Sequence, residues 1–117
     1  MAQSDAATTA AVLTKILKRR PGNTAFLQRA RLLLALFELG SITTVDATRF
    51  LDIIDPRARM FELRNLGYCI MTRPTACATE SGVVHIVGRY VLLSLAQHLP
   101  AWKGNAGWVQ LTLQLNG

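Results

Sequence analysis

The chain of 117 residues is half apolar and 17% charged, which suits one domain of roughly 100–150 residues and excludes wholesale disorder. Its apolar runs are far shorter than the roughly 20 residues that span a bilayer, its first residues do not resemble a secretory signal, and its two cysteines lack the partners of a zinc site. We therefore expect a cytoplasmic protein without membrane association, metal or other cofactor. The net charge is +6, and ten of the thirteen basic residues are arginine. This excess indicates an anionic partner such as nucleic acid, unless it only reflects a GC-rich genome.

Two helices are expected in the first third of the chain. The first covers residues 9–20, with an apolar side, and ends before Pro21. Four basic residues lie at or near its end: Lys15, Lys18, Arg19 and Arg20. The second begins after an N-cap at Asn23 or Thr24 and ends at Leu39, because its apolar residues recur at helical spacing until a glycine follows.

The next segment predicts a short strand and two short helices joined by a tight turn. Residues 41–44 are β-prone but too few for more than a short strand. Thr44 is a suitable N-cap for a helix over 45–51. Asp55 is the expected cap of a helix over 56–66, since a proline occupies the first helical position and a glycine follows the last.

After this helix the pattern changes to β-branched and apolar residues. Residues 69–74 and 83–93 are expected to form a β-hairpin, with a loose tip over 75–82. The order helix, strand, helix, turn, helix and hairpin predicts a winged helix-turn-helix. The expected class is mainly α with a small β-hairpin wing, an α+β fold.

The chain is expected to divide into three parts. Residues 1–22 form a basic amphipathic segment, residues 23–93 the winged helix-turn-helix domain, and residues 94–117 a C-terminal extension. The extension is expected to contain a turn of helix over 94–99 and an alternating strand over 109–115. Because a lone strand needs a partner, it either completes the sheet of the wing or pairs two chains. We expect the second outcome, a homodimer.

The sequence resembles a bacterial family of small winged helix-turn-helix domains that is common in phage, prophage and plasmid-borne genes. The resemblance covers about residues 24–93, roughly 60% of the chain. The matching residues are Arg31–Leu33, Gly40–Thr44, Asp46, Ala47, Asp55–Arg59, Glu62–Arg64, Gly67, Tyr68, Ile70 and Arg89–Leu92. The resemblance implies binding of duplex DNA, usually in gene regulation or mobile-element biology, and it identifies no operator.

The predicted helix over 56–66 is expected to enter the major groove, which is about 12 Å wide and admits one helix. Met60, Leu63 and Leu66 should face the core. The opposite arc carries the candidate DNA contacts Arg57, Ala58, Phe61, Arg64 and Asn65. The two arginines suit phosphates or guanine edges, and the asparagine suits adenine. The alternative for these arginines is a solvated helix face.

Two residues of this helix have other candidate roles. Phe61 packs on a thymine methyl group, belongs to a wider core or marks a protein interface. Arg59 lies beside the core arc, so pairing with Glu62 or Asp55 is favoured over DNA contact.

Further residues are expected to contact the backbone of the duplex. They are Thr43, Thr44 and Arg49 at the first helix of the pair, Arg73 and Arg89 on the wing, and Arg19 and Arg20 before Pro21. The wing is expected to lie along either the backbone or the minor groove. For Thr44, helix capping is the favoured role. The basic cluster before Pro21 is either a second phosphate contact or a solvated helix end stabilised by the helix dipole. His85 on the wing is expected to be a strand-surface histidine.

No arrangement of residues typical of catalysis is present, and we expect a non-enzyme. The predicted function is sequence-specific binding of double-stranded DNA, as a transcriptional regulator or a mobile-element accessory factor. The alternative is a winged-helix protein-interaction module that does not bind DNA. Steep loss of binding with salt would favour DNA, because each neutralised phosphate releases counterions.

Overall fold

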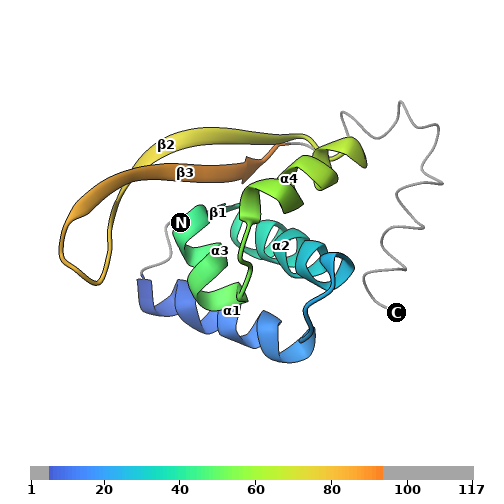
Figure 1. Cartoon of the computed structure of the whole chain (residues 1–117), viewed down its shortest axis with the longest axis horizontal. Coiled ribbons are helices and arrows are strands. Elements are labelled where there is room, and N and C mark those ends of the chain that lie inside the picture. The colour runs from blue at the N-terminus through green and yellow to red at the C-terminus, as the bar shows by residue number, and fades with distance from the viewer. Residues whose placement is uncertain (1–5, 94–117) are drawn as a thin grey trace.

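The computed structural model describes residues 6–93, which form four helices and a three-stranded sheet. The elements are α1 (Ala6–Arg19), α2 (Ala25–Leu39), β1 (Ser41–Thr43), α3 (Thr44–Leu51), α4 (Pro56–Asn65), β2 (Ile70–Ala78) and β3 (Val84–Leu92). The helices gather into one body, and the long β2–β3 hairpin extends from it (Figure 1). The α+β winged helix-turn-helix is confirmed. The helix turn predicted over 94–99 and the strand predicted over 109–115 lie outside the described residues.

The helix ends follow the local capping chemistry, with one correction. Thr24 caps α2, because its Oγ1 accepts from the backbone N–H of Leu27 at 3.1 Å. Gly40 ends α2 in the left-handed region with φ 83°, where glycine has no steric penalty. The prediction that Thr44 caps α3 is wrong. Thr43 holds the extended backbone of a cap and accepts from the N–H of Asp46 at 3.0 Å, whereas Thr44 is already helical.

The α3–turn–α4 unit places α4 on the surface. Asp52 adopts a left-handed conformation with φ 57° at the end of α3, which makes the turn tight. The Asp55 carboxylate then accepts from the N–H of Ala58 at 3.3 Å, and Pro56 opens α4 as predicted. The helix ends one residue earlier than predicted, and Leu66 closes it.

The sheet is antiparallel in the order β1-β3-β2. The β2–β3 hairpin is longer and tighter than predicted, because residues 75–78 pair with β3 instead of forming a loose tip. The turn is closed by the N–H of Gly82, which donates to the carbonyl of Thr79 at 2.8 Å. Pro74 is tolerated inside β2 because this is an edge strand, where a missing N–H costs little.

One core joins all four helices to the sheet. Its sixteen buried apolar residues come from every helix, from β1, β2 and β3, and from the connecting loops. α1 contributes Leu13 and Ile16 and packs against α2 and α3. On α4, Met60 and Leu63 are buried as predicted, but Leu66 is 37% exposed and does not join the core. This position lies beyond the last helical residue, where the helical period no longer fixes the direction of a side chain. None of the described helices is long and apolar enough to cross a membrane.

Candidate nucleic-acid interface

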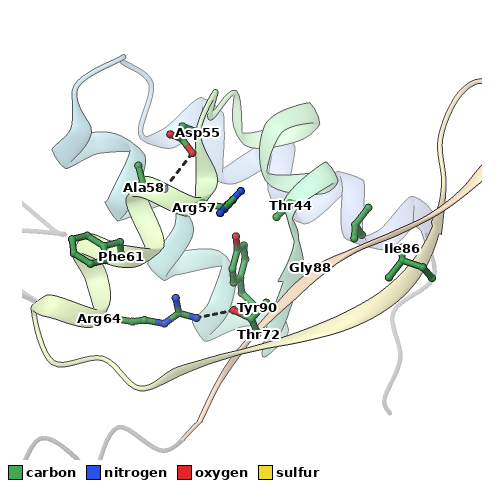
Figure 2. A pocket seen from close by; sticks show the side chains of 11 residues that line it. Thr44, Asp55, Arg57, Ala58, Phe61, Arg64, Thr72, Ile86, Gly88 and Tyr90 are labelled. Atoms are coloured by element: carbon green, nitrogen blue, oxygen red, sulfur yellow. Dashed lines mark hydrogen bonds between the residues drawn. The ribbon is translucent and has the colours of Figure 1, made fainter.

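An open cleft of about 860 Å³ lies between α4 and the β2–β3 hairpin. It is lined by Thr44, Asp55, Arg57, Ala58, Phe61, Arg64, Thr72, Ile86, Val87, Gly88 and Tyr90. One wall is thus the exposed side of α4 and the other is the hairpin, with the start of α3 beside them (Figure 2). Four of the five α4 residues predicted to contact DNA lie together in this cleft. The fifth, Asn65, is exposed but does not line it.

Arg57 is the basic side chain that points freely into the cleft. It is exposed, and in Figure 2 it lies on the side of α4 where Tyr90 is drawn. Phe61 lies one turn further along α4 and is 63% exposed, so it does not belong to the core. A charged and an aromatic side chain therefore stand next to each other on the same face of α4.

Arg64 spans the cleft at its other end. Its Nε donates to the carbonyl of Ile70 at 2.9 Å, and its Nη2 donates to Oγ1 of Thr72 at 2.8 Å. These bonds connect α4 to the start of β2. A guanidinium has five N–H donors, so Arg64 can hold the hairpin and still present charge to a ligand.

Tyr90 forms the base of the cleft. Its side chain is almost fully buried, and this burial raises the pKa of its hydroxyl, although Arg64 and Arg57 partly offset the rise. The phenol is therefore neutral at physiological pH. The cleft combines two guanidinium groups and a neutral hydroxyl with the single carboxylate of Asp55. Its net charge is therefore positive, an arrangement suited to an anion.

A family model described as a winged helix-turn-helix domain matches residues 27–94. The chain belongs to this winged helix-turn-helix family. Membership supports a DNA-binding role in general. A comparison with curated proteins found no match.

The three residues predicted to contact DNA at the first helix of the pair differ in their surroundings. Thr43 is buried at the end of β1 and caps α3, whereas Thr44 lines the cleft. Arg49 forms an ion pair with Glu80 at the hairpin turn, and its guanidinium lies 4.8 Å from the centre of the Phe50 ring. Both partners of this ion pair are more than half exposed, so phosphate can compete with the carboxylate for Arg49.

The arginines of the wing lie on the side of the hairpin that faces away from the cleft. Arg73 and Arg89 are directly opposite each other in the ladder. Their neighbours Thr72 and Tyr90 line the cleft, and successive side chains of a strand point to opposite faces. Arg89 donates to Oγ of Ser41 at 3.0 Å, while Arg73 is exposed. His85 shares their face and is exposed, as predicted for a strand-surface histidine.

Neither arginine before Pro21 lines the cleft. Arg19 is exposed at the end of α1, and Arg20 follows it, half-buried. Arg59 is engaged within the fold, as favoured from the sequence. It pairs with Glu62 at 2.8 Å, and Arg29 of α2 reaches the same carboxylate at 3.0 Å.

The pKa of Glu62 reflects this bridge between α2 and α4. Burial alone would raise the pKa, but hydrogen bonds from Arg59 and Arg29 bring it below its ordinary value. The carboxylate is therefore ionised at neutral pH and pairs with two arginines that do not line the cleft, so that this cluster keeps one net positive charge.

Sequence reasoning missed the hairpin side of the cleft, which consists of Thr72, Ile86, Val87, Gly88 and Tyr90. The alternation of side chains along β3, combined with its pairing to β2, selects Thr72, Ile86, Gly88 and Tyr90, whereas Val87 has the parity of the opposite face and lies between two of these residues in the chain. Gly88 carries a further signal, since a Cβ at that position would lie 3.3 Å from the methyl group of Thr72. A glycine within a β-rich run thus marks a place where another segment of the same chain approaches closely.

Proposed function

We propose that the protein binds double-stranded DNA sequence-specifically and is not an enzyme. It acts as a transcriptional regulator or as a mobile-element accessory factor. The observation that supports this best is the exposed side of α4, on which Arg57, Phe61 and the charge of Arg64 face one open cleft. A ten-residue helix with such a side suits the major groove.

The cleft itself suits the backbone of one DNA strand. In a duplex, a sugar-phosphate strand separates the major groove from the adjacent minor groove. With α4 in the major groove and the hairpin at the minor groove, that strand runs between them, along the cleft. Arg57 is then placed for a phosphate or a guanine edge, and the hydroxyl of Thr44 is placed for a phosphate.

We also propose that two copies bind together, as a homodimer on an inverted repeat. Two-fold sites suit two identical domains, with half-sites about 34–36 Å apart or a multiple of that spacing. The strand predicted over 109–115 is the candidate dimer contact. Gel filtration of the full chain and of a version that ends at Leu99 tests this part. A monomer mass for both would contradict it.

The test of DNA binding is selection of bound duplexes from a random pool, followed by titrations of the selected duplex over a salt series. Arg57→Ala should weaken specific binding by about 1–3 kcal/mol and reduce the salt slope by about one. Arg59→Ala is the matched control, because it removes the same charge from the same helix outside the cleft. Equal affinities of the two variants would contradict the assignment of Arg57.

The exposed Phe61 supports a second candidate, a protein-interaction module. A full chain that binds no duplex even at low salt would favour it. Its partner would then be retained by the Arg57→Ala variant but lost from Phe61→Ser.

A further inference from the structure

The β2–β3 hairpin has two faces of different chemistry. The face on the cleft side carries five cross-strand pairs, Ile70 with Leu92, Thr72 with Tyr90, Pro74 with Gly88, Ala76 with Ile86, and Ala78 with Val84. The other face carries Arg73 opposite Arg89 and Cys77 opposite His85, together with the uncharged pairs Met71 with Val91 and Thr75 with Val87. Beyond Tyr90, the cleft face therefore holds no charged side chain along the ladder, although the protein as a whole is strongly basic.

Two residues of β3 project from this apolar face. Val84 is 62% exposed and Ile86 is 71% exposed. Each stands opposite an alanine of β2, so neither has a large cross-strand neighbour to cover it. We call Val84 and Ile86 the apolar ridge. Covering such exposed β-branched side chains with a partner is favourable, because it removes their apolar surface from water.

The apolar ridge continues the proposed DNA interface. Ile86 lines the same cleft as Arg57 and Arg64, on the opposite wall (Figure 2). A DNA strand bound in the cleft places its minor groove against the hairpin. The walls of that groove are formed by deoxyribose rings, whose C–H surfaces lie away from the phosphates. The minor groove is only about 6 Å wide, and proteins that bind it frequently insert apolar side chains such as isoleucine.

We propose that the wing contacts DNA through the apolar ridge, which packs against the deoxyribose walls of the minor groove, and not through Arg73 and Arg89. This inference rests on the proposed DNA-binding function and assigns the chemistry of its second contact. An apolar contact adds affinity without releasing counterions, so it leaves the salt slope of binding unchanged. The two arginines on the far face contribute only screened, long-range attraction.

The test compares two double variants with the full wild-type chain on its selected duplex. Val84→Ser with Ile86→Ser removes the apolar ridge without changing charge, and both positions are exposed enough to leave the fold intact. Arg73→Ala with Arg89→Ala is the matched variant of the opposite face. At 150 mM salt, we expect the ridge variant to raise Kd about tenfold or more with the wild-type salt slope. We expect the arginine variant to stay within about twofold.

Hydroxyl-radical footprinting locates the contact, since the radical attacks deoxyribose hydrogens. The ridge variant should lose protection in the minor groove beside the α4 site and keep protection by α4. If the ridge variant binds the duplex with the affinity and the footprint of the wild-type chain, the inference is overturned. A large loss of affinity and slope for the arginine variant would overturn it as well. Failure of the wild-type chain to bind any duplex would instead contradict the proposed function itself.

Discussion

Arg31 shows how much one buried side chain can organise. It is the largest side chain that the core buries completely. Its guanidinium donates to the carbonyls of Leu51, Arg20 and Gly22 at 2.7–2.9 Å, and so connects α2 to the ends of α1 and α3. Burial lowers the pKa of Arg31, which the charge of Asp52 partly restores, yet an arginine remains protonated at neutral pH.

We predict that Arg31→Ala destabilises the fold by about 3–5 kcal/mol, because it leaves three carbonyls without their donor and opens a cavity. Urea unfolding measures the change. Arg29→Ala on the same helix is the control. Its partner Glu62 is partly exposed, so we expect a loss of only about 0.5–1 kcal/mol. Equal losses would contradict the role assigned to Arg31.

Tyr68 makes the stability sensitive to alkaline pH. Its side chain is buried, and burial raises the pKa of its phenol well above the ordinary value of 10.0. Above about pH 10, the unfolded chain therefore loses this proton while the folded chain keeps it. The free energy of unfolding then falls as pH rises, by up to about 1.4 kcal/mol per pH unit.

We predict that Tyr68→Phe flattens this alkaline fall in urea unfolding between pH 9 and about pH 11. The comparison uses the slope of the free energy of unfolding against pH and not its absolute value, because removing the Tyr68 hydroxyl also changes stability at neutral pH. Tyr90→Phe should flatten the curve less, because Arg64 and Arg57 oppose the effect of burial on its pKa. A wild-type slope for Tyr68→Phe would contradict this account.

At the scale of elements, α4 depends on a cap that also borders the cleft. Asp55 accepts from the N–H of Ala58 and lines the cleft beside Arg57. We predict that Asp55→Ala costs about 1 kcal/mol of stability, whereas Asp55→Asn costs little, because asparagine caps equally well. Thermal unfolding separates the two. Equal losses would mean that the charge of Asp55 matters and not the cap.

The helices were predictable because their ends are determined by local chemistry. Asp55, Pro56, Thr24 and Gly40 mark ends that neighbouring residues decide. The choice of Thr43 over Thr44 depended on β1, whose pairing with β3 holds Thr43 extended. The length of the hairpin likewise depended on cross-strand pairing, which no local pattern reveals.

At the scale of the whole molecule, the candidate site also combines features that local sequence determines with features that depend on strand pairing. The exposed side of α4 follows from the helical period alone. The hairpin side required the register, which turned Arg73 and Arg89 away from the cleft and left Ile86 in it. Arg31 lies at helical spacing from Leu27 and Leu34, so its position on the apolar stripe was visible in the sequence. Its three acceptors were not, because they come from distant segments.

The whole molecule also extends beyond the family match, which begins at residue 27. α1 precedes the match, yet its Leu13 is completely buried in the common core. The carbonyl of Arg20, just after α1, accepts one of the bonds from Arg31. The matched domain therefore depends on α1 for part of its core and for one acceptor of its buried charge.

We predict that Leu13→Ala destabilises the whole fold by about 2–5 kcal/mol, because it leaves a cavity between α1 and the other helices. Lys15→Ala, an exposed change on the same helix, should alter stability by less than about 0.5 kcal/mol. Both are measured by urea unfolding, followed by fluorescence and by circular dichroism. The two probes should give one coincident transition for Leu13→Ala, since α1 shares the core. A separate early loss of helix, with the main transition unchanged, would show that α1 folds independently of the winged helix-turn-helix.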